Sequence, residues 1–261
     1  MLRKQLARRT RAIGGGLGWR WLLLPPMLAL RGGPSLPFTC GERLSYSAHA
    51  GPGLNGHAEM WVEGPVEYHG SRVFTLNSDV HGGFGPFHLS ERVTSWFDTG
   101  RMASVHFTKD EHTPFDRASE DVDIDPAKQS WRAADGRTGN TPSAQPLDEL
   151  SMLYVLRTLS LPPDSVVQLN RHFDPERNPT RVRLIGTGTV KTPAGTWAVI
   201  DVEMQVRDPR RYRGDGIIRV SLSDDACRRP VRIESRIPGS GTIVLELLAA
   251  EPELPGCTPQ R

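Results

Sequence analysis

The residues of this chain with the clearest potential for chemistry are its eight histidines. Four of them fall within one third of the chain, close to the acidic positions 110 and 111: His81, His88, His106 and His112. His106 and His112 stand on a segment that reads as a strand passing into a loop, and strand alternation can place both on one face. Because a zinc site takes three or four ligands and no third ligand is evident beside this pair, we expect no metal ligands and no cofactor.

Sequence patterns that carry catalysis are missing. The chain contains no His-Glu-x-x-His helix, no Cys-x-x-Cys pair and no Gly-x-Ser-x-Gly elbow. Asp224 and Asp225 are adjacent, so on a strand they would point to opposite faces, and we expect them to cap a loop or to pair with Arg228 or Arg229. The sequence therefore predicts no catalytic residue, and we do not expect an enzyme.

The elements that position these residues are predicted to be mainly β. The 26 Gly and 22 Pro suit many short strands joined by turns. The segment 92–110 reads as two strands around a turn at 98–100, with Met102, Ser104 and His106 on one face of the second strand. The segment 181–206 reads as a hairpin with its turn at 193–195, and its second strand has an apolar face: Ala198, Ile200, Val202, Met204 and Val206. We expect a curved antiparallel sheet or an open barrel.

One segment has helical periodicity instead. Leu150, Leu153 and Tyr154 are spaced to form one apolar stripe. Asp148 is suited to cap the N-terminus, and a Pro-Pro pair at 162–163 ends the segment. The sequence predicts one helix at about 147–159, packed on the curved sheet through these three side chains.

The N-terminal segment 1–35 has the layout of a secretory signal, with a basic head followed by a short apolar run at 21–30. We expect cleavage so that the mature chain begins between about Gly32 and Leu36, and we expect a location in the periplasm or cell envelope. A disordered basic tail, or a start at Met27, is the alternative. The segment 36–251 is predicted to be a single β-rich domain, and 252–261 a C-terminal tail.

Three short motifs, in this order along the chain, resemble a bacterial family known as domain of unknown function 3108. Its opening pattern corresponds here to Pro37, Phe38, Gly41, Glu42, Leu44 and Tyr46. Its helix pattern corresponds to Asp148, Ser151, Leu153, Tyr154 and Arg157. Its closing pattern corresponds to Leu222, Ser223, Asp224, Asp225, Arg228, Pro230 and Val231, with Ser221 where the family tends to have Trp. The resemblance implies an exported, β-rich envelope protein similar in fold to open barrels that hold lipid.

Three functional hypotheses follow. The first is a non-catalytic envelope protein that binds a lipid or other apolar ligand in a cavity between the sheet and the helix, or that assists envelope assembly. Its candidate wall residues are Trp61, Phe74, Trp96, Phe107, Leu150, Tyr154, Trp197 and Val199. The second is a structural or partner-binding envelope protein in which these same side chains fill the core. The third is a hydrolase or metal enzyme with a site of unrecognised type. The net charge of only +2 argues against a nucleic-acid partner.

The three cysteines of an exported chain leave one unpaired. Cys40 precedes the first predicted strand and Cys257 follows the last, and in a meander the first and last strands can meet antiparallel. We therefore expect a Cys40–Cys257 disulfide, with Cys227 free. In the alternative, Cys257 lies on a frayed tail and pairs with nothing.

Overall fold

The fold is built from strands whose alternating side chains give each strand one apolar face. The computed structural model describes residues 36–51, 53–84, 87–113, 117–163, 165–239 and 241–259, so the predicted signal segment 1–35 lies outside the described residues. The first group of strands is β1 (Arg43–Ala50), β2 (Leu54–Tyr68), β3 (Ser71–Phe84), β4 (Phe87–Asp98), β5 (Ala103–His112), β6 (Arg117–Asp125), β7 (Ser130–Ala133) and β8 (Thr138–Asn140). The second group is β9 (Val166–Leu169), β10 (Thr180–Thr192), β11 (Gly195–Val206), β12 (Gly216–Ser223), β13 (Pro230–Ile237) and β14 (Gly241–Glu251).

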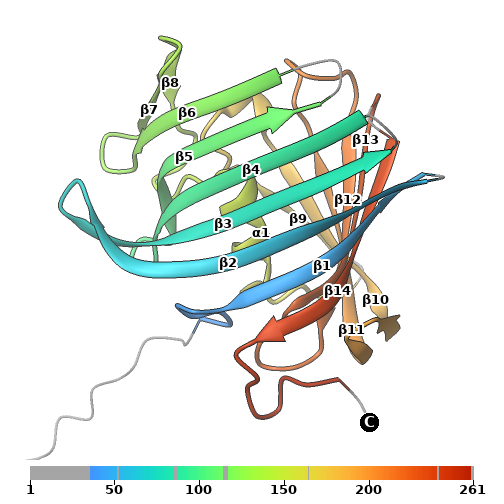
Figure 1. The fold of residues 1–261 in the computed structure, drawn as a ribbon. Helices are drawn as coiled ribbons and strands as arrows, with labels where there is room; N and C mark the ends of the chain where they lie inside the picture. Colours follow the sequence, from blue (N-terminus) through green and yellow to red (C-terminus); the bar gives the residue numbers. More distant parts are fainter. Residues whose placement is uncertain are drawn as a thin grey trace, which may run out of the picture. The chain divides into compact units, whose positions relative to one another are not determined.

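These strands form one antiparallel sheet in the order β8-β7-β6-β5-β4-β3-β2-β1-β14-β13-β12-β11-β10-β9. The sheet therefore consists of two meanders that meet where β1 pairs with β14. It is curved but unclosed, because β8 and β9 remain as its two edges (Figure 1). The predicted curved antiparallel sheet with one helix is confirmed.

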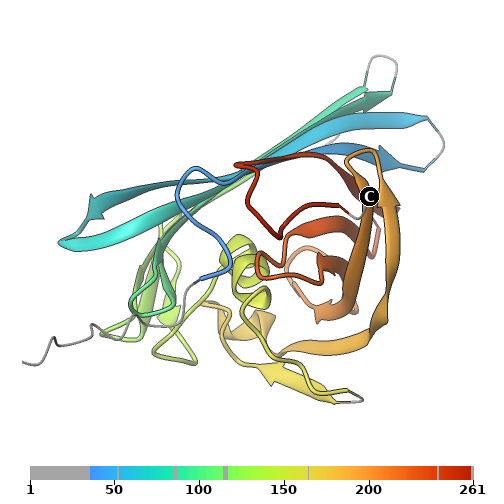
Figure 2. The ribbon, with the colours of Figure 1, turned by 90° about the horizontal axis from the view of Figure 1, so that it is seen from below.

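The helix α1 (Glu149–Leu156) lies inside the curve of the sheet (Figure 2). Asp148 is its N-cap, as predicted: its carboxylate accepts hydrogen bonds from the backbone N–H groups of Leu150 and Ser151, and it also accepts one from Ser95 Oγ on β4. The helix is shorter than the predicted 147–159 because its last turn tightens, with Arg157 N–H bonded to the carbonyl of Tyr154. The short 3₁₀ helix η1 (Pro175–Arg177) follows β9.

The burial of the helix differs from the prediction at one position. Leu150 and Tyr154 are buried as expected, whereas Leu153 is only partly buried. Val155 and Leu156 are buried in its place. Both sides of this short helix contact the core, which is expected where a curved sheet surrounds it.

The predicted alternation along β5 is wrong at one point. The register of β4 with β5 shifts between Trp96 and Phe97, so that Val105 is an extra, bulged residue. Ser104 therefore faces the interior, where its Oγ lies 2.7 Å from Ser151 Oγ of α1, while His106 faces outward. A bulge reverses the faces of the residues on either side of it, and nothing in the local pattern marks its position.

The β11 strand is covered on more of its surface than its pattern predicts. Val202 and Met204 of the predicted apolar face are buried. Trp197 and Val199, which alternate with that face along the strand, are buried as well. The C-terminal segment accounts for part of this cover, because a Cβ on Gly195 would lie 2.6 Å from Pro259. The described part of the chain has no helix whose length and apolar character would let it cross a membrane.

Candidate functional site

The family-like motifs meet around one buried ion pair. The guanidinium of Arg157, just after α1, bonds both carboxylate oxygens of Glu42 at 2.5 and 2.8 Å, and it also donates to the carbonyls of Pro37 and Cys227. Burial alone would lower the pKa of Arg157, but the hydrogen bonds and charge of Glu42 outweigh it and the pKa is raised. The rings of Phe38 and Tyr154 lie against this guanidinium at 5.4 and 5.5 Å. This cluster ties the helix to the start of the domain.

The third motif completes the same framework. Tyr46 Oη donates to the carbonyl of Pro230 at 2.9 Å. Asp225 accepts hydrogen bonds from Ser223 Oγ and from the backbone N–H groups of Cys227 and Arg228, as a loop-capping carboxylate does. The loop-capping role predicted for this acidic pair is confirmed at Asp225. Most of these polar groups bond one another or nearby backbone, as scaffold residues do, although Tyr154 Oη is buried without a hydrogen-bond partner.

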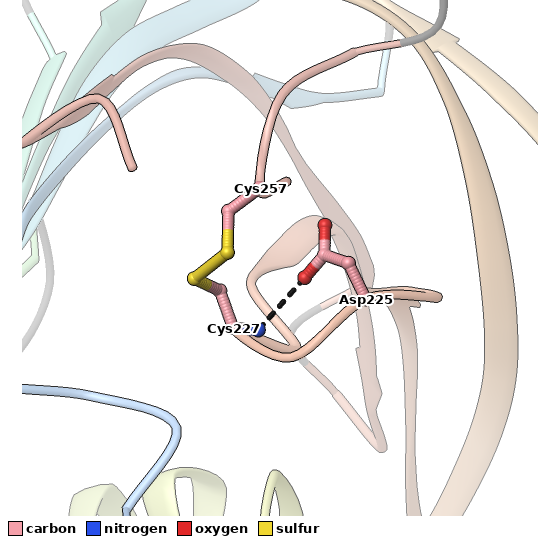
Figure 3. A group of neighbouring side chains, drawn as sticks. All are labelled: Asp225, Cys227 and Cys257. Carbon is pink, nitrogen blue, oxygen red and sulfur yellow. Dashed lines mark hydrogen bonds between the residues drawn. A yellow bond between two sulfur atoms is a disulfide. The ribbon is translucent and has the colours of Figure 1, made fainter. Parts of the chain in front are cut away.

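The disulfide joins Cys227 to Cys257 (Figure 3), with 5.9 Å between the Cα atoms. Cys40 is free and exposed. The predicted Cys40–Cys257 pairing is wrong, although its premise is right: β1 and β14 do meet antiparallel. Cys227 lies in the loop before β13, which is at the same end of the sheet as the end of β14. The tail is held over this loop, because Arg229 donates to the carbonyls of Cys257 and Pro252.

Asp225, Cys227 and Cys257 form a group of three potential metal ligands. Their ligand atoms lie within 4.8 Å of one another, and among the described residues this is the group that meets that criterion. Both sulfurs are used in the disulfide, and the Asp225 carboxylate already accepts the Cys227 N–H (Figure 3). Cysteine binds metal as a thiolate. In the oxidised protein this group is therefore a structural disulfide that links the tail to the loop before β13.

The predicted wall residues divide into two sets. Six of them contribute to the interior, five fully buried and Phe74 partly: Phe74, Phe107, Leu150, Tyr154, Trp197 and Val199. Trp61 and Trp96 do not join this core. Trp61 lies under the guanidinium of Arg43 at 5.1 Å, and the ring of Trp96 packs against His106, which faces outward. The six interior side chains pack in one continuous core with α1, so they fill space that a ligand would need.

The interior also contains a charged network that the sequence did not reveal. Lys109 on β5 lies 2.9 Å from Glu91 and 2.9 Å from Glu149 of α1. Arg177 of η1 lies 2.7 Å from Glu149, Glu120 and Asp208. Burial alone would raise the pKa of Glu149, but the charges of Lys109 and Arg177 hold it well below its usual range. The network joins the β4–β6 wall to the helix and to the loop before β12, which braces the open sheet.

A separate hollow of about 880 Å³ lies on the outside, between the tip of the β2–β3 hairpin and the β6–β8 meander. Tyr68 Oη and His106 Nδ1 each lie 2.8 Å from Asp123 Oδ1 at its edge. Burial alone would raise the pKa of Asp123, but these two hydrogen bonds lower it. A carboxylate held anionic in this way is a poor general base near neutral pH, so Asp123 is better suited to binding than to proton transfer.

Of the four histidines singled out by sequence, the structure brings three around a second outward hollow of about 420 Å³: His81, His88 and His112. His106 lies elsewhere, beside Asp123. His106 and His112, which strand alternation can place on one face, therefore do not line the same hollow. Which histidines come together depends on the pairing register of β3, β4 and β5, and spacing along the sequence does not give that register.

Comparisons with known proteins agree with this framework. A structure search matches a beta-barrel-like protein of domain of unknown function DUF1849 from Brucella abortus, with 11% identity over 80% of this chain and 96% of that chain and a TM-score of 0.56. At that identity the likeness concerns the fold alone. A search of curated proteins gives no match. The profile of the family described as protein of unknown function (DUF3108) matches residues 45–248, and the chain therefore belongs to that family.

Proposed function

We propose that this protein is a non-catalytic protein of the cell envelope that acts by binding a partner, with its own side chains filling the β domain. The observation that carries the proposal is the packing of the six interior wall residues around α1 in one continuous core. Of the three sequence hypotheses, this packing favours the filled-core protein over a lipid carrier. The lipid-binding hypothesis stays a prediction.

Two further features support an envelope location. The N-terminal segment has the basic-then-apolar layout of an export signal. The Cys227–Cys257 disulfide is suited to an oxidising compartment such as the periplasm.

The surface that we assign to the partner is the outer edge of β10. This strand pairs with β9 only from Thr180 to Arg183, and among the described residues no strand pairs with that edge from Leu184 to Thr192. Ile185 on this stretch is 44% exposed. An unpaired strand edge can accept an extended segment of another protein through backbone hydrogen bonds.

Native mass spectrometry of the mature protein, purified from the periplasm of its own host, tests the filled core. We expect the mass of the bare polypeptide. A stoichiometric lipid in the spectrum would restore the lipid-carrier hypothesis and reject ours.

A pair of substitutions gives a second test of the same point. In a filled core, Val199→Trp introduces overpacking that costs about 1–3 kcal/mol in the free energy of unfolding. Val166→Trp is the matched control, since Val166 is 56% exposed on β9. Equal stability of the two variants would show that space is available beside Val199.

Site-specific photocrosslinking in the host tests the partner surface. A photoreactive residue at Thr187 on the free edge of β10 should give a discrete crosslinked species. The same residue at Arg236, which is exposed on β13, should not. Identical crosslinking patterns from both positions would reject the β10 edge as the partner site.

A further inference from the structure

Four outward-facing histidines gather at one end of the first meander. The strand registers pair His57 of β2 with His81 of β3, His81 with Ser90 of β4, and Ser90 with His112 of β5. Directly paired residues in an antiparallel sheet lie on the same face. His88 is two residues before Ser90 on β4, so it lies on this face too.

Three of these side chains surround one hollow. His81, His88 and His112 line the hollow of about 420 Å³, together with Ser90 and Arg117 among others. Within the described part of the chain, the rings of His88 and His112 are exposed and make no hydrogen bond or ion pair. Their nitrogens are therefore available to a ligand that enters from solvent.

The backbone spacing suits a shared metal ion. Neighbouring strands are about 4.8 Å apart and each residue adds about 3.4 Å, which puts the Cα atoms of His81 and His112 about 10 Å apart and that of His88 about 8 Å from each. A histidine side chain with a Zn–N bond of about 2 Å reaches about 6 Å from its Cα. In this structure the ring nitrogens of the three histidines are not all within 4.8 Å of one another, and rotation about their side-chain bonds is needed to bring the three rings to one ion above the centre of this triangle.

Carboxylates lie in the next row of the same face. In the sheet, Asp79 is paired with Arg92, and Arg92 is paired with Asp110. Asp79 precedes His81 by two residues, and Asp110 precedes His112 by two. Asp79 Oδ1 is 2.7 Å from His81 Nε2, and its Oδ2 lies 2.5 Å from Arg92. A carboxylate beside one ring nitrogen orients the imidazole and leaves the other nitrogen for a metal.

From this geometry we propose that His81, His88 and His112 form a surface site for a first-row divalent transition metal ion such as Zn²⁺, Cu²⁺ or Ni²⁺. Three imidazoles select this class of ion over Mg²⁺ or Ca²⁺, which prefer oxygen ligands. The fourth position faces solvent, because the hollow opens outward. Arg117 on β6 also lines this hollow.

The test is isothermal titration of the tag-free full chain with Zn²⁺ alone. We expect one ion per chain. His81→Ala, His88→Ala and His112→Ala should each weaken binding by at least about tenfold, since even loss of a residue that supports a ligand costs about 10–100-fold. His69→Ala is the matched control, because His69 is exposed at the opposite end of the β2–β3 hairpin and should bind Zn²⁺ as the parent does.

Thermal melts without metal check that the variants stay folded, and melts with Zn²⁺ should raise the Tm of the parent and the control only. Parent binding no tighter than that of the triple variant would overturn the proposal. So would loss of binding in His57→Ala with full binding in His88→Ala, which would move the site to the directly paired His57 and His81.

Discussion

Arg157 and Glu42, 115 residues apart in the chain, form a two-pronged ion pair that is almost completely buried. The pair fixes the end of α1 to the segment that leads into β1. Because a buried charge without its partner is strongly destabilising, this contact controls whether the helix stays docked inside the sheet.

We expect Glu42→Gln to lower the free energy of unfolding by about 3–5 kcal/mol, because it leaves the Arg157 guanidinium buried without a counter-charge. Urea unfolding followed by circular dichroism measures this loss. The double variant Glu42→Leu with Arg157→Met is the control, and it should recover most of the stability. A loss below about 1 kcal/mol, the range typical of exposed pairs, would contradict the prediction.

Removal of the disulfide should lower stability separately from the ion pair. The bridge spans 30 positions, and closure of such a loop stabilises by about 3–4 kcal/mol in the chain-entropy account. We expect Cys227→Ser with Cys257→Ser to lose about this much in urea unfolding, and Cys40→Ser to lose nothing. Peptide mapping without reduction should give one crosslinked pair, and a crosslinked peptide that contains Cys40 would contradict the structure.

Stability should depend on pH through His172. Burial, together with the charge of Arg177, lowers the pKa of His172 to about 3. Its Nδ1 accepts the Asp174 N–H, so the folded protein holds it neutral. The unfolded chain takes up a proton below about pH 6.5 while the folded protein does not, so this contribution to stability falls as the pH drops from about 6.5 toward about 3.

The change expected from that single proton is about 1.4 kcal/mol per pH unit. The free energy of unfolding of the parent and of His172→Gln should be measured in urea at several pH values between 6.5 and 4.5. This range separates the contribution of His172 from that of carboxylates, which titrate at lower pH. The difference in free energy of unfolding between the parent and His172→Gln should shrink as the pH falls. His69→Gln is the exposed control, and a parallel response of all three proteins would rule out the role of His172.

Helix α1 offers a graded test of packing. Leu150→Ala should cost about 2–5 kcal/mol because the side chain is buried in the core. Leu153→Ala should cost clearly less, because Leu153 is only partly buried. Equal losses measured by urea unfolding would show that both side chains are equivalent in the core.

Features that depend on neighbouring residues were predictable from sequence. The turns near 98–100 and 193–195, the β class and the Asp148 cap each follow from a local rule about alternation, turn residues or helix termini. Features that depend on register were not. The bulge at Val105 reverses Ser104 and His106, and the outward positions of Trp61 and Trp96 follow from pairings across several strands. An aromatic residue is equally compatible with either face of a strand, so its type alone does not locate it.

The seam between β1 and β14 has a consequence for how the chain reaches this fold. Strand pairs within each meander are close in sequence and can form as each hairpin emerges, whereas Ser47 and Glu246 at the seam are 199 positions apart. Contacts of such separation carry a large loop-closure cost and form late. We therefore expect the two halves to form first as unjoined sheets, each with an exposed apolar face, and to be joined only when β14 pairs with β1.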